Sequence, residues 1–216
     1  MKTDHLIDVL SANLEPVPPG QFGPALILSL VGGGAVALLL MLSTIGPRPD
    51  LHAAPQLWWT ALKELFALSV IAAGAPLLVK SMRPGLDAKM RWRQVLLPFM
   101  VAFVTAALLL FYVGLRAYEV MLGGATGASP ERCLLSIILL AAIPLAALLW
   151  TLRKGAPTRL RLAGFIAGIV AGGVGAAAYA LGCLSDTIPF IAIWYSAAIV
   201  ACGFFGAELG SWLLRW

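Results

Sequence analysis

Charged residues are scarce in this chain. Asp, Glu, Lys and Arg make up only 12% of its 216 residues, whereas 61% are hydrophobic; soluble domains carry roughly 25% charged residues. The mean hydropathy is +0.93. This composition excludes an ordinary water-soluble domain, and the apolar runs leave no segment long enough for a separate soluble core. We therefore predict an all-α membrane protein.

The chain is also short of the residues from which enzymes build active sites. It has two histidines and ten acidic residues. None of them forms a Ser-His-Asp set, a histidine-rich zinc site or a carboxylate pair at catalytic spacing. The glycine run VGGGAV lacks the Lys-Ser/Thr of a phosphate-binding loop. The sequence thus predicts neither an enzyme nor a bound cofactor.

Apolar runs of about 20 residues, the length that crosses a bilayer as a helix, fill most of the chain. We predict six transmembrane helices preceded by a short cytoplasmic N-terminal segment, with 1–20 and 21–216 as the two parts. Proline near or inside such helices is tolerated in a membrane bundle. The predicted spans are Ala25–Ile45, Trp59–Val79, Val95–Leu115, Leu134–Leu152, Leu160–Leu181 and Ile188–Leu213.

Lysine and arginine gather on one side of the predicted bundle. The connections KSMRPGLDAKMRWR and RKGAPTRLR, after the second and fourth spans, are rich in both. With Lys2 and Arg215 they bring most of the 15 basic residues to one side, which the positive-inside rule assigns to the cytoplasm. Acidic residues and His5 interrupt the first twenty residues, so no cleaved signal peptide is expected. Both termini are predicted to be cytoplasmic.

The first fifteen residues have the pattern of a short amphipathic helix. Leu6, Ile7, Leu10 and Leu14 fall on one face, and the following EPVPPG ends the helix because proline cannot continue it. A helix of about twelve residues is marginal alone in water, so this apolar stripe needs a partner surface. The polar face is acidic, which disfavours anionic lipid and favours a basic protein groove. A solvated leader without a partner stays open.

Two of the three cysteines lie at the predicted outer face. Cys133 and Cys183 are beside short turns there, whereas Cys202 lies within the sixth span and is expected to be a packing residue. Three interpretations of the outer pair stay open: a structural disulfide, a thiol pair that senses oxidants or soft metals, and two unrelated buried thiols. A soft metal would take both thiolates, and the further candidate ligands are His52, Asp50, Glu131 and Asp186.

Few charged residues lie inside the predicted spans, and each has a structural interpretation. Lys63 and Glu64 are near the outer interface, where pairing or snorkelling is expected rather than an ion path. Glu208 lies toward the inner end of the sixth span, where a hydrogen bond inside the bundle is expected.

Small residues repeat at every fourth position in the last two spans. Such repeats let helices approach closely, and here they predict packing within the bundle rather than dimerisation. The residues are Gly164, Gly168 and Gly172 in the fifth span and Gly206 and Gly210 in the sixth.

Several of these features together resemble one family. The opening MKTDHLIDVLSANLEPV, the six spans, the cysteines in ERCLLS and LGCLSDTIP and the ending GAELGSWLLRW are similar to those of the NrsF-type membrane anti-sigma factors. The resemblance implies a protein of the bacterial inner membrane. It further implies that the protein holds an extracytoplasmic-function (ECF) sigma factor inactive until stress is sensed, without contacting nucleic acid directly.

The resemblance also assigns roles to particular residues by position. It implies a sigma-binding segment and a pair of sensory cysteines. It also implies that the remaining chain lies in the lipid bilayer. The sigma-binding residues are Leu6, Ile7, Asp8 and Leu10, with Leu14 on the same stripe, and the sensory cysteines are Cys133 and Cys183.

Two other functions stay open beside an anti-sigma factor. A small-solute transporter or channel would need polar residues along a path at mid-membrane, where this sequence has mainly Ala, Leu, Val, Ile and Gly. A scaffold subunit would use the basic inner loops to dock a different cytoplasmic partner.

Overall fold

The computed structural model describes residues 22–49, 54–82, 92–113, 129–155 and 157–215. Within these ranges the chain forms helices and no strand, in agreement with the predicted all-α class. The predicted N-terminal amphipathic helix lies outside the described residues. The elements are α2 (Phe22–Thr44), α3 (Ala54–Ser81), α4 (Trp92–Val113), α6 (Pro130–Arg153), α7 (Leu160–Ala180), α8 (Ile188–Phe190), the π-helix η2 (Ile191–Tyr195) and α9 (Ser196–Leu213).

Five of the described helices are long and apolar enough to cross a membrane. They are α2, α3, α6, α7 and the continuous helical run of α8, η2 and α9. α4 overlaps the third predicted span, and Arg93–Leu108, the part of it whose side chains the structure describes, is apolar but shorter than these five helices. The described chain therefore has the helices of a membrane protein, while a total of six spans stays a prediction.

Large apolar side chains cover the outside of the bundle. Leu28, Leu39, Leu139, Trp150 and Phe204 are each more than 60% exposed. Soluble proteins rarely expose apolar surface of this extent. The hydrocarbon of a bilayer is a favourable surrounding for such side chains, because they then avoid contact with water.

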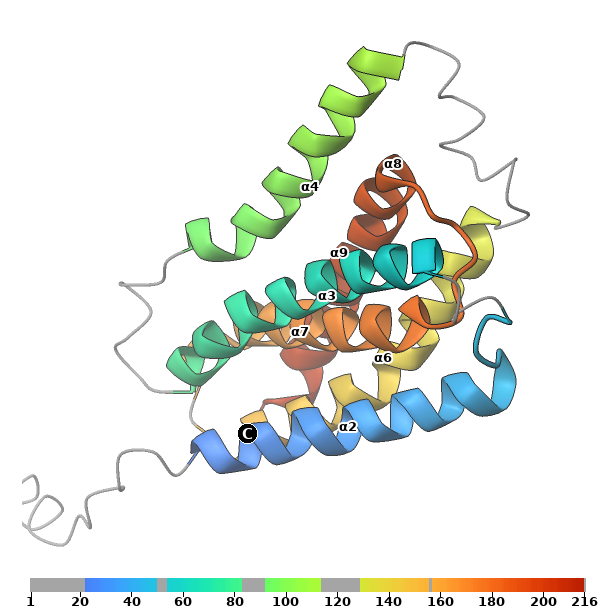
Figure 1. Cartoon of the computed structure of the whole chain (residues 1–216). Coiled ribbons are helices and arrows are strands. Elements are labelled where there is room, and N and C mark those ends of the chain that lie inside the picture. Colours follow the sequence, from blue (N-terminus) through green and yellow to red (C-terminus); the bar gives the residue numbers. More distant parts are fainter. Residues whose placement is uncertain (1–21, 50–53, 83–91, 114–128, 156, 216) are drawn as a thin grey trace, which may run out of the picture.

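α7 forms the centre of the bundle (Figure 1). It packs against α9, α6, α3 and α2, and nearly all of its residues are buried. Its sequence, LRLAGFIAGIVAGGVGAAAYA, is rich in glycine and alanine. These small residues let the backbones of neighbouring helices approach closely, which explains why this helix occupies the centre.

Glycines from both helices form the contact between α7 and α9. A Cβ atom on Gly164 would collide with the carbonyl oxygen of Gly206, and one on Gly206 would collide with that of Gly164. A Cβ on Gly210 would lie 2.8 Å from the Cα of Gly164. The two backbones therefore touch, and the prediction of close packing within the bundle is confirmed.

Three of the described helices have a proline in their interior, within the predicted spans. Pro76 lies in α3, Pro98 in α4 and Pro144 in α6. Pro144 also faces α2, since a Cβ on Gly33 would lie 2.9 Å from the Cα of Pro144. Glycine at this position lets α2 pack directly on the proline of α6.

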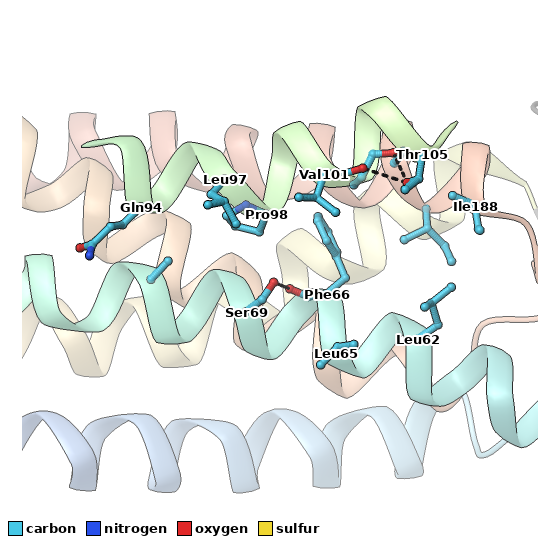
Figure 2. A pocket seen from close by; sticks show the side chains of 14 residues that line it. Leu62, Leu65, Phe66, Ser69, Gln94, Leu97, Pro98, Val101, Thr105 and Ile188 are labelled. Carbon is cyan, nitrogen blue, oxygen red and sulfur yellow. Dashed lines mark hydrogen bonds between the residues drawn. The ribbon is translucent and has the colours of Figure 1, made fainter. Parts of the chain in front are cut away.

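α4 stands apart from the other helices in Figure 1 and contacts the bundle through α3, α8 and η2. The rings of Phe66 and Phe99 meet edge to face with centroids 6.0 Å apart. A groove of about 450 Å³ runs between α3 and α4 (Figure 2). Apart from Gln94, its polar groups are the hydroxyls of Ser69 and Thr105, which donate to carbonyls of their own helices. A lining this apolar does not support the interpretation of the chain as a transporter or channel.

Candidate functional site

Several helix ends meet around two cysteines at one end of the bundle. Here α2 and α7 end and α3, α6 and α8 begin; we call it the cysteine end. The link between α7 and α8, residues 181–187, is called the Cys183 turn. The backbone amide of Arg48, just after α2, donates to the carbonyl of Leu181 at 3.1 Å. This hydrogen bond joins the turn to the end of α2.

Two glycines let the chain after α2 pass close to the Cys183 turn. Gly46 has a φ of +76°, the left-handed conformation that commonly ends a helix, and its amide donates to the carbonyl of Met41 at 3.0 Å. A Cβ on Gly182 would lie 3.1 Å from the carbonyl oxygen of Gly46. The two segments are therefore in contact, which brings Arg48 to the turn.

Three charged side chains from three segments meet here. The guanidinium of Arg48 binds the carboxylate of Asp186 through two hydrogen bonds, Nη1 to Oδ1 at 2.8 Å and Nη2 to Oδ2 at 2.9 Å. Lys63, in α3, donates from Nζ to Oδ1 at 3.0 Å. Lys63 is fully buried, so pairing rather than snorkelling is confirmed for it. We call these three residues the ion triad.

Both cations of the ion triad also hold the backbone of Cys183. Its carbonyl oxygen accepts hydrogen bonds from Nη1 of Arg48 at 3.2 Å and from Nζ of Lys63 at 3.0 Å. Hydrogen bonds from charged donors are stronger than neutral ones. The position of Cys183 is thus fixed by one side chain at the end of α2 and one in α3.

Asp186 carries a negative charge in these surroundings. Burial alone would raise its pKa, but the hydrogen bonds and charges of Arg48 and Lys63 outweigh that effect and hold the pKa below its usual value of 3.8. The ion triad therefore combines two positive charges with one negative charge. Removing one partner from a buried ion pair costs about 3–5 kcal/mol, because the other charge is left uncompensated.

Cys133 and Cys183 both lie at the cysteine end and are both buried. Cys133 is in the first turn of α6, and each of the two is only 1% exposed. Neither forms a disulfide. The two thiols lie within electrostatic range of each other, and the ammonium of Lys63 lies within range of Cys133. The structure thus groups the two candidate sensory cysteines beside the ion triad.

Cys202 is separate from this pair. It lies in α9 and is 2% exposed. A Cβ on Gly172 of α7 would lie 3.1 Å from the Cβ of Cys202. Its interpretation as a packing residue between α7 and α9 is confirmed.

Two tyrosines pack beside the thiols. The rings of Tyr179 and Tyr195 have centroids 6.3 Å apart, and the side chain of Cys183 adjoins the hydroxyl of Tyr195. This hydroxyl is buried without a hydrogen bond of ordinary geometry in the described part of the chain. Tyr195 also ends η2, and π-helical turns are frequent at functional sites.

Other hydroxyls near this end are also buried without a hydrogen-bond partner in the described part of the chain. A buried polar group without a partner costs about 1–3 kcal/mol, so the surroundings of the cysteines are polar but incompletely hydrogen-bonded. Besides Tyr195, the described residues with such a hydroxyl are Ser129, Ser185, Thr187 and Ser196.

The predicted metal ligands do not form a complete site in the described residues. Among these, no group of three or more His, Cys, Asp and Glu side chains is placed to hold a metal ion. Asp186 is bound by Arg48 and Lys63 instead of facing a metal site. His52 lies outside the described ranges, so its part in a metal site stays a prediction.

The opposite end of the bundle is rich in basic residues, and we call it the basic end. Lys80 lies in the last turn of α3, Arg153 ends α6, and Arg93 and Arg161 lie in the first turns of α4 and α7. Nε of Arg153 donates to the carbonyl of Leu213 at 2.9 Å. This hydrogen bond holds the end of α6 to the end of α9.

Glu208 does not lie inside the bundle, contrary to our expectation. Its side chain is 71% exposed, and its carboxylate is 3.6 Å from the guanidinium of Arg161. The reason is its position between Gly206 and Gly210, which both face α7. Two residues correspond to about 200° around an α-helix, so a side chain between two inward glycines points outward.

Comparisons with known proteins decide the family. The model of the NrsF family, described as negative regulator of sigma F, matches residues 10–216. The chain belongs to the NrsF family. It is 37% identical over 225 residues to the anti-sigma-F factor NrsF of Caulobacter vibrioides and 34% identical over 221 residues to the probable anti-sigma-F factor NrsF of Azospira oryzae, in both cases with the whole of each chain covered. No solved structure matches it. The predicted resemblance is therefore confirmed.

The NrsF family model begins at Leu10, inside the predicted docking segment. Leu6, Ile7 and Asp8 precede the matched range, and Leu14 lies within it. All five residues lie outside the part of the chain that the structure describes. Their role in binding a sigma factor stays a prediction.

Sequence reasoning missed the ion triad of this NrsF family member. Lys63 was expected to pair or to snorkel, and Asp186 was considered as a metal ligand. A signal was nevertheless present, because a lysine in an otherwise apolar helix needs a partner inside the bundle. Asp186 was one of the acidic residues on the same predicted side as Lys63.

Proposed function

We propose that this chain is a membrane-bound anti-sigma factor that sequesters an ECF sigma factor through its N-terminal segment. The observation that carries the proposal is the match to the NrsF family over nearly the whole chain. Membership of a family of negative regulators of sigma F implies a sigma factor as the partner. The ECF class of that sigma factor and the docking segment are part of the proposal.

The docking segment is residues 1–20. Leu6, Ile7, Leu10 and Leu14 supply an apolar face, and Asp8 contributes to the acidic side of the helix. Proteins that bind nucleic acid are generally basic, as a sigma factor is expected to be. An acidic amphipathic helix therefore suits a basic groove of that partner in a helix-in-groove complex.

The basic end faces the cytoplasm of a bacterial cell in this proposal, and the cysteine end faces the outside of the inner membrane. The concentration of lysine and arginine at the basic end supports this orientation. The start of α2 also lies there, because the Ser29 hydroxyl meets the Thr151 hydroxyl near the end of α6 at 2.5 Å. Residues 1–21 are thus attached at the end proposed to be cytoplasmic.

Cys133 and Cys183 sense envelope stress in this proposal. Oxidation would join the two sulfurs in one bond, with two electrons and two protons passing to the oxidant. Binding of a soft metal ion would instead take both thiolates and release two protons. Either event would link the start of α6 to the Cys183 turn. The closeness of the two unpaired thiols supports this role.

Release of the sigma factor requires that the two states of the bundle bind it with different affinities. A difference of about 3 kcal/mol changes the affinity by roughly 150-fold at most.

Pull-down from detergent tests the docking segment. We expect the double variant Leu6→Glu, Leu10→Glu to insert normally into the membrane and to lose the sigma factor, because the apolar face of the helix is destroyed. Ser11→Glu is the matched control, since it adds a charge to the polar face and should retain binding. Retention of the sigma factor by the double variant contradicts the docking hypothesis. A different stoichiometric partner in place of a sigma factor would favour the scaffold alternative.

A further inference from the structure

The ion triad connects the turn that carries Cys183 to the helix that follows the N-terminal segment. α2 begins at Phe22, directly after residues 1–21, and ends at Thr44. Shortly after it, the side chain of Arg48 holds both the carbonyl of Cys183 and the carboxylate of Asp186. One guanidinium thus links a candidate sensory residue to the helix attached to the candidate docking segment.

We propose that Arg48 is a positioning residue through which a change at Cys183 reaches α2 and, by way of α2, the N-terminal segment. This inference rests on the proposed function and names the path of its regulation. When the Cys183 sulfur bonds to the Cys133 sulfur or to a metal ion, the backbone of Cys183 moves with it. The hydrogen bonds from Arg48 then pass that movement to the end of α2.

Burial makes this link firm. The side chain of Arg48 is only 2% exposed, so water cannot replace the oxygens of Asp186 and Cys183 as acceptors. Breaking its charged hydrogen bonds to these oxygens in buried surroundings is unfavourable. The lower-energy response to a movement of the Cys183 turn is for Arg48, and the end of α2 with it, to follow.

α2 is suited to transmit such a movement. It has 23 residues, which corresponds to a rigid rod of about 35 Å, long enough to cross the hydrocarbon core. Only 22% of its apolar stretch is buried in the bundle, against 83% for α7. α2 therefore breaks fewer contacts than α7 when it shifts.

Lys63 provides a matched comparison. Arg48→Gln and Lys63→Met each remove one cation and one hydrogen bond to the Cys183 carbonyl. Each variant leaves Asp186 with one buried cationic partner, so the remaining pair is neutral. The variants differ in the segment whose side chain is disconnected from the turn, which is the chain just after α2 in the first and α3 in the second.

The experiment uses the full chain in cells with a reporter under a sigma-dependent promoter. Diamide is the oxidant; its N=N bond takes two electrons and two protons from the two thiols as one S–S bond forms. Three quantities are measured: the amount of protein in the membrane, the thiols that remain reactive to maleimide after denaturation, and the ratio of transcription with and without diamide.

We expect both variants to accumulate and to lose free thiols with diamide as the wild type does. The transcription ratio should fall clearly below that of the wild type in Arg48→Gln, which keeps the backbone hydrogen bond to Leu181 but not the guanidinium, and stay near that of the wild type in Lys63→Met. Arg161→Gln, which removes the exposed pair with Glu208, should behave as the wild type. If Arg48→Gln and Lys63→Met both keep the response to diamide, or both lose it, the assignment of α2 as the path is wrong.

Two further variants separate this inference from its premises. If Cys133→Ser still responds to diamide, the cysteine sensor itself fails, whatever the ion triad variants show. If Arg48→Gln does not accumulate, Arg48→Lys replaces it, because lysine keeps the charge but not the two-point geometry. A reduced ratio in Arg48→Lys, with normal thiol oxidation, supports the inference, and a wild-type ratio overturns it.

Discussion

Arg48 and Asp186 are 138 positions apart in the sequence, yet their side chains form a two-point ion pair with N to O distances of 2.8 and 2.9 Å. Arg48 follows the first described helix, and Asp186 lies just before the final helical run. Lys63 adds a second cation to the same carboxylate. Among the described residues, Asp186 is thus the carboxylate that both buried cations of the cysteine end share.

Asp186→Asn should therefore destabilise the protein strongly. The substitution keeps the shape of the side chain but removes the carboxylate that Arg48 and Lys63 share, and breaking a buried ion pair costs about 3–5 kcal/mol. We expect a lower unfolding temperature in detergent and less protein in the membrane. Glu208→Gln is the control, because its exposed pair with Arg161 contributes at most about 1 kcal/mol. An unfolding temperature equal to that of the wild type would contradict a stabilising ion triad.

Acid should reduce the stability of the protein by protonating the carboxylate of Asp186. The pKa of Asp186 lies below its usual value of 3.8 in the folded protein. Its contribution to stability is therefore fully present above that usual value and is lost as the pH falls through the lowered pKa. We expect the difference in unfolding temperature between wild type and Asp186→Asn to be constant from about pH 7 to about pH 5 and to shrink below about pH 4. A constant difference at all pH values would speak against ionisation of Asp186 as the cause.

The glycine contact between α7 and α9 should not tolerate even a methyl group. A Cβ on Gly168 would collide with the carbonyl oxygen of Cys202 and lie 2.7 Å from the Cα of Gly203. Overpacking of this kind costs about 1–3 kcal/mol, so Gly168→Ala should unfold at a lower temperature than the wild type. Gly32→Ala, in α2, is the matched control, because nothing lies within 4 Å of the added Cβ, and alanine favours a helix by about 1 kcal/mol over glycine. Equal unfolding temperatures for the two variants would refute this close approach.

Cys133 and Cys183 should act as one unit. Cys133→Ser and Cys183→Ser each remove one partner of a shared bond, so we expect the same loss of response to oxidant or cadmium from each, and no further loss in the double variant. Cys202→Ala, at the α7 contact, should respond normally. Transcription from a sigma-dependent promoter is the measurement. Normal induction in the double variant would exclude the cysteine sensor and leave the docking segment unaffected.

The helices of the described chain could be predicted because each corresponds to one long apolar run. The backbone of such a run must satisfy its own hydrogen bonds in a membrane, and a helix does so. The π-helix Ile191–Tyr195 could not be predicted, since the run Ile188–Leu213 is continuously apolar. Hydropathy does not distinguish its i→i+5 hydrogen bonds from the i→i+4 bonds of an α-helix.

The cysteine end could be predicted only in part. Topology alone placed Cys133, Cys183 and Lys63 on one side, because every crossing reverses the direction of the chain. Which charges meet inside that end depends on how the helices rotate and pack, which hydropathy does not specify. Glu208 shows the same limit, since its place in the sixth span predicted a position inside the bundle, whereas its side chain is exposed and Gly206 and Gly210 face α7 instead.

The ion triad also joins two halves of one polypeptide. Arg48 and Lys63 belong to the half that ends with α4, and Asp186 belongs to the half that begins with α6. The halves meet where α3 lies on α7 and α2 lies on α6, surfaces that need no peptide bond between them. A chain cut between α4 and α6 would still contain both faces of each contact. In such a reassembled bundle, the ion pair of Arg48 and Asp186 becomes a bond between two molecules.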